Sequence, residues 1–172
     1  MANRKWQKGF TLLELVISVL VIAILYGVLS TRLGRVAESA ERAAVYGVLG
    51  QVRQQLNLRL AKFYIDGSSD KAKALINENP FSWISPPPSQ YAGEVSDATE
   101  VLIKGRWYFD RVTKQLIYRV KRNNNIKIEG GEQRNLRFVL KLNGKAADTQ
   151  QKSAVYSIKI QAVKPFVWNI GA

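Results

Sequence analysis

A long apolar stretch at residues 10–29 constrains this chain more than any other feature of its sequence. Its interior consists of Leu, Ile, Val and Ala, with Ser18, Tyr26 and Gly27 as mild exceptions and Glu14 as its one charged residue. Twenty residues of α-helix, at about 1.5 Å rise per residue, extend about 30 Å, which matches the hydrocarbon core of a bilayer. The stretch therefore predicts a membrane-spanning helix.

Glu14 raises the free energy of inserting such a helix into a membrane. An acidic side chain near the middle of a membrane helix costs about 2.5–3.5 kcal/mol on insertion scales. Two interpretations follow from the residues alone. Glu14 lies at the level of the lipid headgroups, or it pairs with a positive group that is created nearby.

The charges on either side of the stretch predict its orientation. Arg4, Lys5 and Lys8 precede it without an acid, whereas Arg32 and Arg35 are followed closely by Glu38 and Glu41. The positive-inside rule places the basic N-terminal side in the cytoplasm. The residues after Leu29 contain no Ala-x-Ala cleavage site of the secretory type, so we expect the stretch to be retained as an anchor.

The arrangement Gly9-Phe10-Thr11-Leu12-Leu13-Glu14 resembles the prepilin signature of type IV pilins and type II secretion pseudopilins. The resemblance implies that a prepilin peptidase cuts between Gly9 and Phe10 and N-methylates Phe10. It also implies that the new α-amino group pairs with Glu14 of a neighbouring subunit. The implied partners are the prepilin peptidase, other pilin or pseudopilin subunits, an inner-membrane assembly platform protein and membrane lipid.

Composition limits the chemistry of the chain. It contains no Cys and no His, so disulfides, thiol catalysis and the commonest general base are excluded. No phosphate-binding loop or paired-carboxylate motif is present, and we expect no enzymatic activity, no cofactor and no metal site. The chain also lacks the calcium loop of major pseudopilins and the C-terminal Cys pair of many major pilins. Both departures favour a minor or accessory pilin-like subunit.

An apolar stripe continues beyond the membrane stretch. Its members recur at spacings of three and four residues, which is the helical period: Val36, Ala40, Ala43 or Ala44, Val48, Val52, Leu56, Leu60 and Phe63. We expect one continuous helix from Phe10 to about Ile65. The predicted organisation is a basic leader (1–9), a transmembrane segment (10–29), an amphipathic continuation (30–65) and a globular periplasmic α+β domain (66–172).

The sequence of the globular part predicts a short helix, a loop and several strands. Ser69 is expected to cap a helix that ends at Glu78, and Phe81, Trp83 and Ile84 are expected to hold the loop 79–93 to the core. Residues 106–109 and 115–121 flank a turn at 110–114, which predicts a hairpin. Apolar residues alternate with polar ones at 115–121, 136–142 and 154–163, which predicts antiparallel strands with one covered face. The fold class is therefore α+β and pilin-like, with a long N-terminal helix packed on an antiparallel sheet.

A net charge of +13 makes polyanions conceivable partners, and removing the leader leaves about +10. Basic residues gather with aromatic ones at 101–128, and the candidate polyanion contacts are Arg106, Arg111, Lys114, Arg119, Lys121 and Arg122. Three interpretations stay open: a core strand pair with a solvated basic face, a contact with acidic neighbours, and DNA binding. Two functions follow, a structural filament subunit and a pilin-like module that captures DNA or another polyanion.

Overall fold

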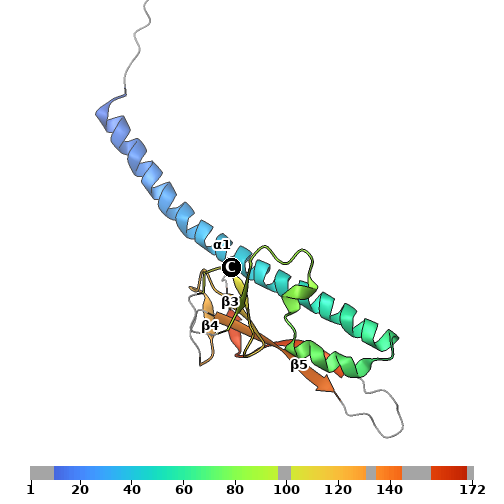
Figure 1. Cartoon of the computed structure of the whole chain (residues 1–172). Coiled ribbons are helices and arrows are strands. Elements are labelled where there is room, and N and C mark those ends of the chain that lie inside the picture. The colour runs from blue at the N-terminus through green and yellow to red at the C-terminus, as the bar shows by residue number, and fades with distance from the viewer. Residues whose placement is uncertain (1–9, 97–101, 131–134, 145–155, 170–172) are drawn as a thin grey trace, which may run out of the picture. The chain divides into compact units, whose positions relative to one another are not determined.

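The computed structural model describes residues 10–96, 102–130, 135–144 and 156–169 (Figure 1). The chain forms two compact units, one within Met1–Ser39 and one within Ala40–Ala172. Helix α1 (Leu12–Ile65) contributes to both of them. Two 3₁₀ helices and seven strands follow it: η1 (Ser69–Asn77), η2 (Pro80–Trp83), β1 (Tyr91–Val95), β2 (Trp107–Asp110), β3 (Gln115–Arg119), β4 (Ile126–Ile128), β5 (Asn135–Gly144), β6 (Tyr156–Ala162) and β7 (Phe166–Trp168).

The predicted long helix is confirmed, because α1 begins two residues after Phe10 and ends at Ile65. In the second unit it buries one stripe of side chains: Glu41, Val45, Val48, Leu49, Val52, Leu56 and Leu60. The expected stripe was wrong at its beginning, since Val36 and Ala40 are exposed, and of the alternatives Ala43 and Ala44 it is Ala44 that is half-buried. A carboxylate, Glu41, occupies the start of the buried face instead.

The main sheet has five strands in the order β1-β2-β3-β5-β6. The predicted hairpin is confirmed, with Trp107 opposite Tyr118 and Asp110 opposite Gln115. β3 pairs antiparallel with β5, and β5 pairs antiparallel with β6. β1 departs from the expectation because it pairs parallel with β2, so the sheet is mostly and not wholly antiparallel.

The sheet is buried on both faces around the hairpin, which corrects the expectation of one covered face. On one face Trp107, Phe109, Leu116 and Tyr118 pack with the stripe of α1. On the other face Tyr108 and Ile117 pack with Val95 and Leu102. Val95 of β1 and Leu102 therefore contribute to a small core on this face, which the alternation of β3 did not reveal.

A second sheet of two strands pairs β4 with β7, and the sequence did not predict it. Ile126 and Trp168 face each other in this pair, and both side chains are buried in the main core. Each strand has three residues. Strands this short show no alternation that could be recognised in the sequence.

The segment between α1 and β2 follows the prediction in part. The short helix is a 3₁₀ helix, and its N-cap Ser68 makes no side-chain capping bond, so the proposed cap at Ser69 was wrong. Phe81 and Trp83 are buried as expected. The expected loop at 79–93 contains η2 and the start of β1.

A fragment that lacks residues 1–34 should fold, because the buried stripe of α1 and both cores lie in the second unit. Its circular dichroism should show mixed helix and strand, and it should sediment as a monomer. A spectrum dominated by disorder would contradict the assignment of the core.

Candidate functional site

Thr11 caps the first turn of α1. The Glu14 amide N–H donates to the Thr11 hydroxyl oxygen at 3.2 Å, and the Leu15 amide N–H donates to the Thr11 carbonyl at 3.1 Å. Thr11 is thus the N-cap, and Glu14 is the third helical residue, which is the spacing of a capping box. The Glu14 carboxylate lies at the positive end of the helix dipole, which favours a negative charge there.

The helix is apolar around its whole circumference from Leu12 to Leu29. Its large apolar side chains are exposed on every side, and an 18-residue window has a mean hydropathy of 2.7. Two hydroxyls form hydrogen bonds inside the helix, since Ser18, within this stretch, donates to the Glu14 carbonyl and Ser30, directly after it, donates to the Tyr26 carbonyl. By length and composition α1 can cross a membrane.

Of the three residues predicted for processing and assembly, the structure describes two. Phe10 is 79% exposed, and Glu14 is exposed one turn later. Gly9 and the rest of the predicted leader lie outside the described residues.

The second unit holds α1 through a buried carboxylate. Glu41 accepts hydrogen bonds from the amide N–H of Lys121 (2.6 Å), the amide N–H of Arg122 (3.1 Å) and the Tyr118 hydroxyl (3.0 Å). The Arg122 guanidinium lies 4.0 Å from the same carboxylate. We call Glu41, Tyr118, Lys121 and Arg122 the Glu41 clamp. It joins α1 to the end of β3.

The Tyr118 hydroxyl remains a donor in the clamp. Burial raises the pKa of Tyr118 well above its usual value, and the charge of Glu41 and the hydrogen bond to it raise it further. Tyr118 therefore stays protonated throughout the physiological range. The clamp is a permanent link between helix and sheet.

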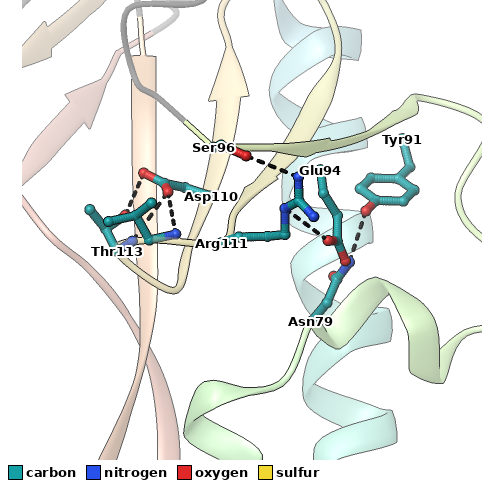
Figure 2. A network of polar contacts seen from close by, with 8 residues as sticks. Asn79, Tyr91, Glu94, Ser96, Asp110, Arg111 and Thr113 are labelled. Carbon is teal, nitrogen blue, oxygen red and sulfur yellow. Dashed lines mark hydrogen bonds and ion pairs between the residues drawn. The ribbon is translucent and has the colours of Figure 1, made fainter.

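A polar network ties β1 to η2 (Figure 2). The Asn79 amide donates to the Tyr91 hydroxyl and to Glu94, both at 2.8 Å, and Glu94 lies 3.5 Å from the Arg111 guanidinium. Arg111 also donates to the Ser96 hydroxyl at 2.9 Å. These bonds hold the parallel edge strand in place, and they commit Arg111 to a structural role.

Asp110 organises the hairpin turn (Figure 2). Its carboxylate accepts from the Val112 and Thr113 amides and from the Thr113 hydroxyl at 2.8, 3.1 and 2.6 Å. Burial alone would raise the pKa of Asp110, but the hydrogen bonds from Thr113 and Val112, together with the charge of Arg137, hold that pKa below its usual value.

Acid should therefore weaken the hairpin. A group with a depressed folded-state pKa contributes stability above its unfolded pKa, and that stability is lost as the pH falls through the folded pKa. At pH 7 we expect Asp110→Asn to lower the free energy of unfolding by about 1 kcal/mol. The deficit should shrink as the pH falls below about 4. Urea unfolding of both proteins across this range checks it, and parallel curves would contradict it.

The six candidate polyanion contacts divide between two ends of the hairpin. Arg111 and Lys114 flank its turn, where Lys114 has a φ of 56°. Arg106, Arg119, Lys121 and Arg122 lie at the opposite end, next to the Glu41 clamp. The structure thus does not unite all six, and the aromatic residues between them are buried: Trp107, Tyr108, Phe109 and Tyr118.

An apolar N-terminal helix with an acidic first turn, continued by a stripe that packs on a mostly antiparallel sheet, defines a pilin-like α+β protein. Residues 7–29 match the family described as the prokaryotic N-terminal methylation motif. The chain thus carries the prepilin-type motif of the pilin family. Neither the curated proteins nor the solved structures gave a match.

The motif has several consequences. It implies processing by prepilin peptidase, anchoring in the inner membrane before assembly, and assembly with pilins. Proteins of this family are structural and generally not enzymes. Together with the fold, the motif indicates a pilin or pseudopilin subunit.

The roles of two residues in these sites, Thr11 and Glu41, were not predicted from the sequence. Thr11 could have been found, because a Thr followed three residues later by Glu at the head of an apolar run is a helix-start signal. Glu41 could not, since its partners lie 77–81 residues further along the chain.

Proposed function

We propose that this chain is a minor or accessory structural subunit of a filament rooted in the bacterial inner membrane, either a type IV pilus or a type II secretion pseudopilus. The observation that carries the proposal is the match of residues 7–29 to the methylation motif, on a helix that is exposed and apolar on all sides. Such a helix needs lipid or other apolar helices around it. A filament of packed pilin helices provides the second environment after the bilayer provides the first.

Processing and assembly use three residues in this proposal. Prepilin peptidase removes the leader 1–9 by cutting between Gly9 and Phe10, and it methylates the new amino group of Phe10. That cation pairs with Glu14 of a neighbouring subunit. Thr11 supports this arrangement because it caps the helix whose first turn carries Glu14.

The proposed membrane topology also defines the domains. Residues 10–29 span the membrane with the N-terminus in the cytoplasm, residues 30–65 continue the helix, and residues 66–172 form the periplasmic domain. The assembly platform protein of the inner membrane then adds the subunit to the filament. The Glu41 clamp holds the helix to the domain during that transfer.

Site-specific cross-linking tests the proposal. A photoreactive residue at Leu20, which is 58% exposed on the apolar helix, should cross-link to another pilin-like chain in cells that contain the assembly system. A matched probe at the exposed Leu58, on the helix beyond the membrane segment, reports contacts of the folded domain. The adduct at Leu20 should disappear when the platform protein is deleted. Cross-links to lipid alone, unchanged by the deletion, would contradict a filament role.

The alternative, capture of DNA or another polyanion, is less well supported. Single-stranded nucleic acid is bound by basic grooves with exposed aromatic rings on which bases stack. Here the aromatic residues of β2 and β3 are in the core. Of the cations next to the Glu41 clamp, Arg106 and Lys121 are exposed, and Arg119 and Arg122 are half-buried.

A further inference from the structure

Five cations gather at the end of the second unit where α1 enters it. We call this set the basic end: Arg42, Lys104, Arg106, Lys121 and Arg122. Arg122 is half-buried, and the other four are exposed. The Arg122 side chain still retains 38% of its accessible surface.

Backbone contacts bring these residues together from three segments. The Lys121 and Arg122 amides bind Glu41 on α1, the residue before Arg42, whose guanidinium lies 5.9 Å from the centre of the Tyr46 ring. The Gly105 amide donates to the Arg119 carbonyl, and the Arg119 amide donates to the Arg106 carbonyl. A Cβ at Gly105 would lie 3.7 Å from the Lys121 side chain, so Lys104 and Arg106 flank the same spot.

The acids at this end offset the positive charge of the cations only in part. Glu41 is 8% exposed and is already occupied by the clamp, and Glu38, one turn earlier on α1, is 2% exposed. Asp110 lies at the far end of β2, in the hairpin turn. Among the described residues, the five cations thus outnumber the carboxylates at this end, and the basic end keeps a net positive charge even though Glu41 lies 4.0 Å from the Arg122 guanidinium.

The membrane is the anionic surface that the chain itself brings near. Glu41 follows Leu29, the last residue of the apolar stretch, by 12 residues, which is about 18 Å of helix. The length of this helical segment limits how far the basic end can lie from the membrane surface, whose polar region adds roughly 5–8 Å per leaflet. A Debye length of about 8 Å at physiological salt extends the range over which the cations are attracted.

We propose that the basic end binds anionic phospholipid headgroups of the membrane in which α1 is anchored, while the subunit waits for assembly. The inference rests on the proposed membrane anchoring. Tethering through α1 makes the contact intramolecular, so several weak attractions suffice. Each Lys or Arg near an anionic surface is expected to favour the contact by about fivefold. Leaving the membrane for the filament would then release these cations for acidic neighbours.

The test uses the full chain in nanodiscs and exploits its lack of cysteine. A single fluorophore is attached through Asn124→Cys, in the exposed turn that follows the basic end, or through Val112→Cys in the hairpin turn. The bilayer contains lipids with a quencher on the headgroup. We expect stronger quenching at position 124 in bilayers with phosphatidylglycerol than in phosphatidylcholine alone. Position 112 should not respond, and about 0.5 M salt should abolish the difference because it shortens the Debye length.

Two variants with the same change in net charge separate the basic end from total charge. Lys104→Glu combined with Lys121→Glu should reduce the lipid-dependent contact by about 25-fold or more. Lys62→Glu combined with Lys71→Glu, beyond the opposite end of the α1 stripe, should leave it unchanged. Circular dichroism confirms that both variants are folded.

Several results would overturn the proposal. Equal quenching in both kinds of bilayer at low salt would show that headgroup charge is not recognised, and so would equal loss in both variants. If a single-stranded oligonucleotide binds the basic end while bilayer charge has no effect, the surface is a nucleic-acid site. Failure of the chain to co-elute with nanodiscs of either composition would contradict the anchoring itself.

Discussion

Replacing Glu14 by Ala should leave membrane insertion and cleavage intact and should sharply reduce incorporation into filaments. In the proposed assembly, the carboxylate meets the methylated amino group of Phe10 of a neighbouring subunit in a low-dielectric setting, where the attraction far exceeds its value in water. Losing one partner strands the other charge. A charge stranded in the membrane costs about 2.5–3.5 kcal/mol, which is on the order of a hundredfold in an association constant.

The structure supplies a control for this prediction, because Glu14 also lies in the capped first turn of its own helix. Thr11→Val removes the side-chain cap and should cost the helix about 1 kcal/mol while leaving the carboxylate in place. Filament recovery is then compared at matched expression for the wild type, Glu14→Ala and Thr11→Val. Only Glu14→Ala should be strongly depleted. Equal recovery of all three proteins would assign Glu14 to the headgroup level and remove its pairing role.

The second large effect is expected at Glu41. Its side chain is 5% exposed, and Ala would leave two backbone N–H groups, the Tyr118 hydroxyl and the Arg122 guanidinium without their acceptor. Breaking a buried charged contact of this kind costs about 3–5 kcal/mol. Urea unfolding of the full chain in detergent, followed by the fluorescence of the core residues Trp107 and Trp168, measures the loss.

Two variants calibrate the clamp. Tyr118→Phe removes one hydrogen bond to Glu41 and should cost about 1 kcal/mol. Gln51→Ala changes an exposed side chain of the same helix and should be nearly neutral. If Glu41→Ala behaves like Gln51→Ala, the carboxylate is not the link between helix and sheet.

Local signals explain what the sequence could predict. The apolar stretch, Gly9-Phe10 and Glu14 lie within one short segment, and the bounds of α1 follow from a continuous helical period. The hairpin of β2 and β3 was predictable because two runs of aromatic and aliphatic residues flank a turn, in which the Asp110 carboxylate accepts hydrogen bonds from the next residues. Each of these features depends on residues that are close together in the sequence.

The remaining features depend on residues far apart in the chain. Ile117 lies on the same side of β3 as Arg119, but Val95 and Leu102 pack with it. The sequence showed Glu41 only as one of the charges that follow the apolar stretch, whereas its partners come from the end of β3 and the residues after it. The parallel pairing of β1 and the β4–β7 pair likewise arise from tertiary contacts that no local pattern encodes.

The intact mass of the chain in cells with active prepilin peptidase tests the central claim most directly. The account predicts a mature protein that begins with N-methylated Phe10, and Gly9 replaced by a large residue should yield only the uncut precursor. A conservative control, Gly9→Ala, should be cut more than a bulky replacement. Recovery of the full 172-residue chain, uncut and unmethylated in the presence of the active peptidase, would contradict the account.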